Sequence, residues 1–446
     1  MQYDKQGNIL STPNPKAAFL FSEAINDFLN YRTTPSARLK EALHIDPDFA
    51  LATCFRACFL MMTESPAVLS KIQKTVQELQ VGYKNLTERE ILHIEALSAW
   101  ANLDIIKACQ IWENLIANAP RDILAIKLHH TMTFYTGRSQ TLRSVIEGVL
   151  TSWNSEISNF SALQGMYAYA LEECGEHQEA ERWGREAVAS NPDDLWAIHS
   201  VAHILDMQQR HAEGVIWLNY SAENWTDRNP FKAHLWWHTA LFHIGLNDLE
   251  CALSIHDELL LSVNTDTYVD VSNQASLLKR IEIGGMDVGD RWEMLSEYSE
   301  QRINDHMLAF RDLHFCLALA AGKKKKEAET QLRSMEKFAL TDNNYTAAAT
   351  KTVLIPLCKG IIEYEDGNYK KACEHLWKIR NDLAPIGGSH TQRDLFQQIL
   401  EDAAIKGKCF GKAGNLLSER LSRHPQNPIY LAKKAKLADL SPTQNS

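Results

Sequence analysis

The chain has 446 residues, of which 45% are hydrophobic and 23% charged, and its formal net charge is −10. This composition is typical of a globular protein that can bury a large core. The acidic balance argues against a protein that grips nucleic acid or an anionic membrane through its overall field. The sequence has no uncharged apolar run of about 18 residues, and its N-terminus lacks the basic residues followed by an apolar run that mark a signal peptide. With the acidic charge, this predicts a cytoplasmic protein without nucleic-acid or membrane partners.

The nine cysteines are scattered through apolar segments, and no two are spaced as C-x-x-C. This pattern indicates reduced, buried thiols and excludes a disulfide framework or a zinc ribbon as the basis of the fold. Cys54 and Cys58 share one helix face and are expected in the core.

Apolar residues recur at helical spacing along almost the whole chain, which predicts an all-α protein. Three similar boundaries, "IDPDFALA", "NAPRDILAIK" and "SNPDDLWAIH", place Pro47, Pro120 and Pro192 just before a new helix. The intervals from 47 to 120 and from 120 to 192 are 73 and 72 residues, each close to twice the tetratricopeptide period of about 34 residues.

Helical hairpins of this kind cannot bury their apolar faces alone and must stack. We therefore predict a tetratricopeptide-like α-α superhelix, a right-handed solenoid of antiparallel helix pairs. Residues 16–435 should form this single solenoid. Residues 1–15 are expected to be a loose N-terminal extension and residues 436–446 a flexible tail.

The stretch "DLWAIHSVAHILDM" carries two histidines four residues apart, which places them on one helix face. The predicted core stripe of this helix is Ile198, Val201, Ala202 and Leu205. The neighbouring stripe holds Trp196, His199, His203 and Asp206. In tetratricopeptide stacks that stripe lines the concave side, so we expect these side chains to face a groove.

The next unit repeats the pattern. In "KAHLWWHTALFH", His234 and His238 are again four residues apart, beside Trp237. Because both helices would be the first helices of adjacent repeats, the two histidine pairs are expected to lie side by side. This convergence is the strongest functional signal in the chain.

A third cluster, "NDHMLAFRDLHF", supplies His306, Asp312 and His314, and a tightly curled solenoid would bring it towards the first two. His129 and His130 are expected on the packing side of their helix.

The stretch "PIGGSHTQRDLFQQIL" resembles a phosphate loop, but Ser389 and Gln392 suffice as an S-x-x-Q capping box. Arg393 and Asp394 then lie in the first turns of a helix, where a polar ligand could meet them.

Three interpretations of the histidines compete. Histidines at i, i+4 can chelate zinc, but "HSVAH" lacks the glutamate of H-E-x-x-H. We therefore expect no metal and no cofactor, with zinc or iron bound by His199, His203 and His234 as the lesser alternative. In the second interpretation neutral imidazoles act as acid and base on a small molecule. In the third, Trp and His furnish a binding groove without chemistry.

The leading prediction is a tetratricopeptide-repeat binding protein whose concave Trp/His-lined pocket holds a small polar ligand or a short peptide end. A lining of Trp, His and Asp suits a small polar ligand better than a peptide carboxylate. Self-association into a homo-oligomer is left open. The expected ligand-binding residues are Trp196, Asp206, Trp237, His238, Asp312, His314, Gln392, Arg393 and Asp394.

The alternative function is a small-molecule enzyme, hydrolase- or lyase-like and with or without a metal ion. It would use His199, His203 and His234 as its catalytic residues. A groove open along its length favours binding, whereas a sealed site with converging His and Asp favours chemistry.

From about residue 20 to 430 the sequence resembles the tetratricopeptide repeat protein 38 family. The stretches that carry the resemblance are "LTERE", "KACQIWENLI", "LHHTMTFYTG", "HSVAHILDM", "HLWWHTALF", "DVGDRW", "DHMLAFRDLHF", "EDGNY" and "GGSHTQRDLF". Thr131 and His390 depart from the family pattern. The resemblance implies a tetratricopeptide-like superhelix and no particular reaction. It adds weight to His199, His203, His234, His238, Asp312, His314, Gln392, Arg393 and Asp394.

Overall fold

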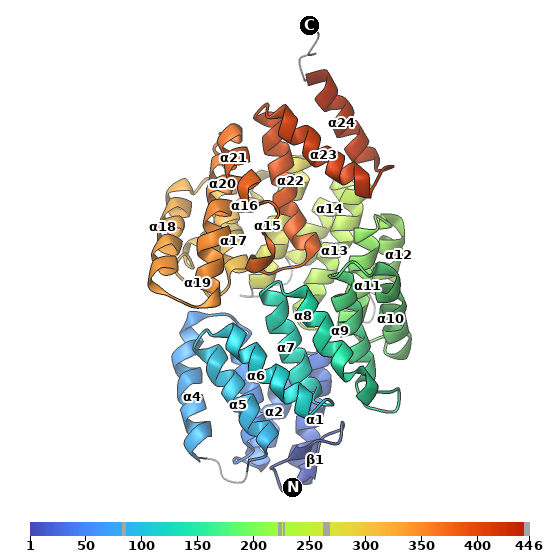
Figure 1. The fold of residues 1–446 in the computed structure, drawn as a ribbon, viewed down its shortest axis with the longest axis vertical. Coiled ribbons are helices and arrows are strands. Elements are labelled where there is room, and N and C mark those ends of the chain that lie inside the picture. The colour runs from blue at the N-terminus through green and yellow to red at the C-terminus, as the bar shows by residue number, and fades with distance from the viewer. Residues whose placement is uncertain (83–85, 222–224, 226–227, 262–267, 441–446) are drawn as a thin grey trace.

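A computed structural model describes residues 1–82, 86–221, 225, 228–261 and 268–440. Within them the chain is built almost entirely of helices, which confirms the predicted all-α class. Two short strands, β1 (Gln2–Tyr3) and β2 (Ile9–Leu10), pair antiparallel at the N-terminus. The molecule is elongated, with the N-terminus at one end and the C-terminal helix at the other (Figure 1).

The first half of the chain forms consecutive helical hairpins. Its helices are α1 (Pro15–Leu29), α2 (Pro35–Ile45), α3 (Ala50–Met61), α4 (Leu69–Gly82), α5 (Glu88–Ala101), α6 (Ile105–Asn118), α7 (Ile123–Tyr135), α8 (Ser139–Val149), α9 (Phe160–Glu172), α10 (His177–Ser190), α11 (Leu195–Met207) and α12 (His211–Ser221). Short 3-10 turns, η1 (Pro66–Val68) and η2 (Leu150–Ser152), stand before α4 and after α8.

The second half continues the same pattern. Its helices are α13 (Phe231–Gly245), α14 (Leu249–Ile255), α15 (Tyr268–Ile283), α16 (Trp292–Glu300), α17 (Ala309–Ala321), α18 (Lys325–Thr341), α19 (Tyr345–Ala349), α20 (Ile355–Glu365), α21 (Tyr369–Ile379), α22 (His390–Lys406), α23 (Phe410–Arg423) and α24 (Pro428–Leu440). Two π-helical turns, η4 (His256–Leu260) and η6 (Thr350–Leu354), prolong α14 and α19, and 3-10 turns η5 (Gly289–Arg291) and η7 (Ala384–Ile386) precede α16 and α22.

The predicted helix starts are confirmed. Helices α3, α7 and α11 begin just after Pro47, Pro120 and Pro192. An aspartate caps two of them: Asp122 Oδ1 accepts from the Ala125 amide at 2.9 Å, and Asp194 accepts from the first turn of α11. These caps satisfy amides that have no partner within the helix and fix where each first helix begins.

The core of α11 is the predicted stripe. Its four side chains are fully buried: Ile198, Val201, Ala202 and Leu205. Cys54 and Cys58 are buried, as expected. All nine cysteines are free thiols, but Cys174, Cys251 and Cys409 are only partly buried. None of the helices in the described part of the chain combines the length and apolarity needed to cross a bilayer.

The N-terminal segment is not the loose extension predicted for residues 1–15. Leu10 and Thr12 are buried, and the Gln6 amide donates to the Ser158 carbonyl at 3.0 Å. The hairpin of β1 and β2 supplies the local order that composition alone did not reveal. At the other end, residues 436–440 continue α24, and residues 441–446 lie outside the described residues.

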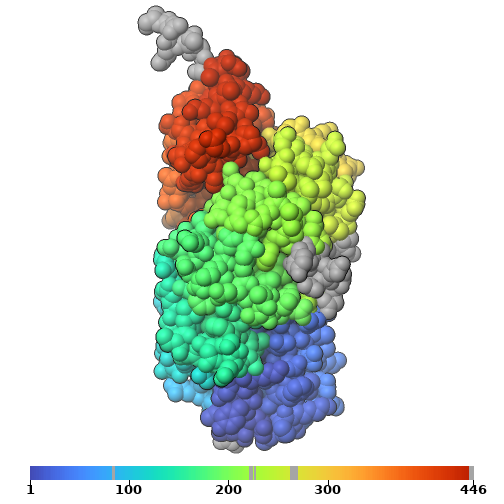
Figure 2. All heavy atoms as spheres, turned by 90° about the vertical axis from the view of Figure 1, so that its right-hand side faces the viewer, coloured from blue at the N-terminus to red at the C-terminus, as the bar shows by residue number. Residues whose placement is uncertain are grey.

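Late helices lie against early ones, because the superhelix curls tightly. The Tyr345 hydroxyl donates to the Thr136 carbonyl at 2.7 Å, and the Thr391 hydroxyl donates to Asp206 at 3.0 Å. The space-filling view shows α9 to α13 in the middle of the molecule, between the N-terminal and C-terminal helices (Figure 2). The inner face of these middle helices is therefore partly covered by residues that follow α21.

Candidate functional site

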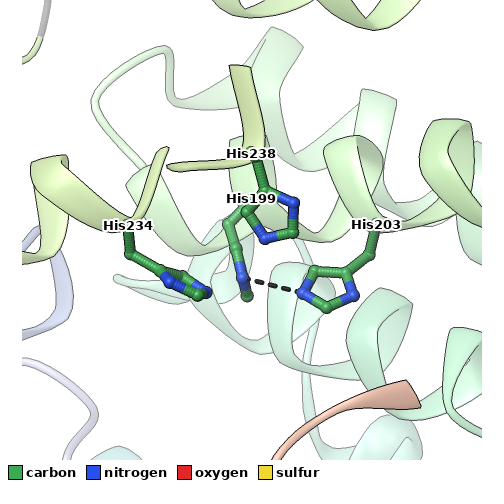
Figure 3. Close-up of side chains that lie close together, drawn as sticks. All are labelled: His199, His203, His234 and His238. Atoms are coloured by element: carbon green, nitrogen blue, oxygen red, sulfur yellow. Dashed lines mark hydrogen bonds between the residues drawn. The ribbon is translucent and has the colours of Figure 1, made fainter. Parts of the chain in front are cut away.

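The four predicted histidines converge. Helix α11 supplies His199 and His203, and α13 supplies His234 and His238 (Figure 3). The centre of the His199 ring lies 4.4 Å from that of His203, 4.9 Å from that of His234 and 5.0 Å from that of His238. The Nε2 atoms of His199 and His203 are 2.9 Å apart, so one ring donates to the other. We call these residues the four-histidine cluster.

The cluster is buried, with side chains only 0 to 5% exposed, so these histidines do not face a groove that is open to solvent. Tyr31 and Phe231 stack at 4.1 Å, and Phe231 packs 5.3 Å from His199, which closes one side. Burial lowers the pKa of His199, His203 and His238 well below the usual value and that of His234 to about 4. The four rings are therefore neutral at pH 7.

Aromatic rings extend the cluster along the inner face. Trp196 lies 4.9 Å from His199, and Tyr169 of α9 stacks almost parallel to His199 at 5.8 Å. His130 of α7 meets Tyr169 and Trp196 edge-on at 5.7 and 5.4 Å. His130 is buried, as expected, but it packs against these functional candidates and so belongs to the same surface.

Two carboxylates adjoin the cluster, and sequence reasoning missed both. Glu172, at the end of α9, is buried, and its Oε2 lies 3.8 Å from His203 Nδ1. Burial raises the pKa of Glu172 well above the usual value. The neighbouring Glu173 accepts from the His390 amide at 2.9 Å and lies 3.5 Å from the Arg393 guanidinium. Of the residues predicted in α22, Arg393 is thus the one that reaches the neighbourhood of the cluster.

Two further predicted residues border the site. Trp237 stacks on His234 with ring centres 5.0 Å apart, and its Nε1 donates to the Ser276 hydroxyl. His234 Nδ1 lies 2.9 Å from the Asn273 amide oxygen, to which it can donate. Asp206, near the end of α11, accepts a hydrogen bond from the Thr391 hydroxyl. Burial raises the pKa of Asp206.

The remaining predicted residues have local partners of their own. Asp312 pairs with His306 at 2.7 Å, and Asp394 pairs with Arg420 at 3.0 Å. Gln392 completes the predicted capping box with Ser389. His314 donates to the carbonyl of its own helix at Phe310. Among the described residues, no hydrogen bond, ion pair or ring contact joins the third histidine cluster to the first two.

A concentration of unpartnered polar atoms marks the inner face. These atoms are buried and have no hydrogen-bond partner in the described part of the chain: both ring nitrogens of His130 and of His238, the Tyr169 hydroxyl, both Glu172 oxygens, Trp196 Nε1, and Nδ1 of His199 and of His203. They come from α7, α9, α11 and α13. Because each such group costs about 1–3 kcal/mol, their gathering at one place indicates a site kept for binding or chemistry.

A buried lysine stands at the edge of this surface. Lys127 Nζ lies 4.2 Å from the centre of the Trp196 ring and donates to the Tyr31 hydroxyl at 2.9 Å. Burial lowers the pKa of Lys127 to about 7. Burial also raises the pKa of the nearby Asp194 to about 6.

We predict that Lys127→Met stabilises the protein at pH 7 by about 1–3 kcal/mol, since it removes a buried cation that burial disfavours. Between about pH 7 and pH 10 the unfolded chain binds more protons at this lysine than the folded chain, so stability of the native protein rises with pH there. Urea unfolding of the native protein and Lys127→Met should show that their free energies of unfolding differ less at about pH 9.5 than at pH 7. Lys16→Met, at an exposed lysine, should leave the free energy of unfolding unchanged at both pH values.

Comparisons with known proteins give only distant likenesses. No protein-family model matches the chain. The APC/C hetero-tetramer Cut9-Hcn1 is 13% identical, with 86% of this chain and 76% of that chain covered and a TM-score of 0.39. The structure of Naa15/Naa10 bound to HypK-THB is 11% identical, with 94% and 75% covered and a TM-score of 0.28. The helices of this chain themselves show its fold, an all-α superhelix of consecutive helical hairpins.

Proposed function

We propose that this protein is a tetratricopeptide-like binding protein that holds a small polar ligand against the inner face of α7, α9, α11 and α13. One observation carries the proposal: buried imidazole, hydroxyl, indole and carboxyl atoms that have no hydrogen-bond partner among the described residues gather there. A ligand that offers several donors and acceptors would satisfy them, whereas an apolar ligand would leave them unpaired. Residues 16–435 would act together as one solenoid in presenting this face.

A small ligand fits this face better than the short peptide end that the sequence also allowed. A peptide end needs a groove open to solvent, and the four histidines are at most 5% exposed. Two hollows of the described surface lie elsewhere. One is lined by residues 367–371 and 406–408, and the other lies between α4 and α5 around Gln73 and Asn102.

We also propose that the chain belongs with the tetratricopeptide repeat protein 38 family. The support is the order of the matching stretches, several of which carry the side chains of the inner face. "HSVAHILDM" and "HLWWHTALF" supply the four-histidine cluster, and "LHHTMTFYTG" supplies His130.

Native mass spectrometry tests the binding role. The protein is incubated with a protein-free small-molecule extract of the expressing cells, and its intact mass is compared with that of the denatured chain. We expect a discrete organic mass increment, reduced in Tyr169→Phe, which deletes only an unpartnered hydroxyl. Tyr3→Phe, at a side chain 65% exposed, should retain it. A mass equal to the bare chain, or to the chain plus a metal ion alone, contradicts small-molecule binding.

A second candidate function is a small-molecule enzyme of the hydrolase or lyase kind. The observation that favours it is the sealed pairing of neutral imidazoles with Glu172, whose raised pKa keeps a proton available 3.8 Å from His203. An acid beside a base with pKa values pushed apart is the arrangement that general acid–base catalysis uses.

The same extract tests the second candidate. We expect depletion of one metabolite and appearance of a product with the native protein, and a rate at least about 100-fold lower with Glu172→Gln. Equal rates in Glu172→Gln and the native protein would remove the enzyme candidate without affecting the binding role.

A further inference from the structure

The four-histidine cluster has the dimensions of a metal site. Each of the four residues offers one ring nitrogen, and these nitrogens all lie within 4.8 Å of one another. Two nitrogens bound tetrahedrally to one zinc ion, each at about 2.0–2.1 Å, are about 3.3 Å apart. The His199 and His203 Nε2 atoms, 2.9 Å apart, approach this spacing (Figure 3). This pair must open by a few tenths of an ångström, and any pair that stands nearer the 4.8 Å limit must close towards the same spacing, when an ion enters.

The outer nitrogens of two rings face acceptors, as those of metal ligands do; that of His234 is within hydrogen-bond distance, and that of His203 is not. A metal-bound histidine generally donates its second ring N–H to a carboxylate or carbonyl, which fixes the tautomer and aims the other nitrogen at the metal. His234 Nδ1 faces the Asn273 amide oxygen at 2.9 Å, and His203 Nδ1 faces Glu172 at 3.8 Å. Donation by these Nδ1 atoms would leave each Nε2 with the lone pair that a metal ion needs.

Charge supplies an independent argument. Glu172 is buried, and neither of its oxygens has a hydrogen-bond partner among the described residues. A carboxyl group in that position can be ionised only with a cation nearby. A divalent ion held by the adjacent imidazoles would be that cation, because four neutral rings do not cancel the positive charge of the ion.

We propose that His199, His203, His234 and His238 bind one divalent first-row transition-metal ion, with zinc as the best fit, and that Glu172 is a positioning residue for His203. Imidazole ligands suit this class of metal, whereas Mg²⁺ and Ca²⁺ prefer oxygen ligands. The ion would join α11 to α13, the first helices of adjacent repeats. This assigns a metal where the sequence favoured none, and it does not depend on the organic ligand proposed above.

Metal titration of the full chain tests the assignment. The protein is stripped with a chelator, desalted and titrated with Co²⁺, whose visible d–d bands report coordination geometry, and then with Zn²⁺. We expect one Co²⁺ per chain with the band intensity of a tetrahedral nitrogen site, displaced by Zn²⁺. His203→Gln and His238→Gln should each weaken binding by at least about 100-fold. Glu172→Gln should weaken it by about 10- to 100-fold and shift the bands, since it reorients a ligand.

Control variants separate this site from others. His44→Gln, at an exposed histidine, should bind as the native chain does. Cys251→Ser removes a member of a second possible group, His243, Asp248 and Cys251, and should also leave binding unchanged. Circular dichroism establishes that each variant is folded. If one of the two histidine variants does not fold, the other still tests the assignment.

Three results would overturn the assignment: no Co²⁺ uptake by the native chain, uptake without tetrahedral bands, or equal affinity in the folded histidine variants and the His44→Gln control. Loss of binding in Cys251→Ser with retention in His203→Gln would place the ion at the surface group instead. Failure here leaves the mass-spectrometric test of the organic ligand untouched, so the two proposals fail separately.

Discussion

Gly387→Ala is expected to lower the free energy of unfolding by about 3 kcal/mol or more. Gly387 has φ +81° and ψ −164°, a conformation that is essentially restricted to glycine. A Cβ there would also lie 2.5 Å from the backbone carbonyl oxygen of Tyr135. Neither backbone can yield easily, because the turn after α7 also meets η7 at Gly137, where an added Cβ would overlap the Ala384 carbonyl.

The matched control is Gly367→Ala. Gly367 has a similar φ of +79°, but an added Cβ would meet nothing within 4 Å. It should cost only about 1–2 kcal/mol, the price of the left-handed backbone alone. Chemical denaturation of the three proteins measures both values. Equal losses in the two variants would mean that the close approach of the Tyr135 carbonyl adds nothing to the cost of a Cβ at position 387.

Asp122→Ala is expected to cost about 3–5 kcal/mol, because it breaks a buried charge cluster and removes a helix cap together. Asp122 is 1% exposed; its Oδ2 lies 2.6 Å from Arg89 Nη1 and 2.9 Å from His93 Nε2, while Oδ1 caps α7. Asp122→Asn can keep the cap and loses only the charge, so it should cost less. Urea unfolding at pH 7 compares the two variants, and an equal loss would assign the whole effect to the charge.

The pH dependence of this effect has a definite sign. Burial alone would raise the pKa of Asp122, but the charges of His93 and Arg89 outweigh it and hold the pKa well below the usual range. The stabilisation from Asp122 is therefore complete above the unfolded pKa of about 3.9 and is lost as the pH falls below it. The stability gap between the native protein and Asp122→Asn should be widest at neutral pH and narrow in acid. A constant gap would contradict the ion pairs.

Local features of the sequence sufficed to predict the helical repeat and the convergence of the four histidines. The prolines and capping aspartates fix where α7 and α11 begin. Helical periodicity then places His199 and His203 on one face of α11 and His234 and His238 on one face of α13. Because first helices of adjacent repeats pack side by side, the convergence of the two pairs followed from the repeat register.

The burial of the cluster and the role of Glu172 could not be predicted, because they depend on how the superhelix curves over long stretches of the chain. Burial of the cluster depends on Tyr31 and on the start of α22, which are distant in sequence and whose approach no periodicity encodes. Glu172 lies in "YAYALEEC", where a carboxylate at a helix end ordinarily indicates a solvated position. In the third cluster His306 and Asp312 pair with one another across a tight turn in which His306 has φ +48°, a partner that helical periodicity did not predict.

The most direct test of the metal centre is anomalous X-ray diffraction from crystals grown with Zn²⁺, with data collected on both sides of the zinc absorption edge. We predict an edge-dependent peak enclosed by His199, His203, His234 and His238, about 2.0–2.1 Å from one nitrogen of each ring. A map in which the His199 and His203 Nε2 atoms remain hydrogen-bonded to each other, with no edge-dependent peak between the four rings, would contradict it.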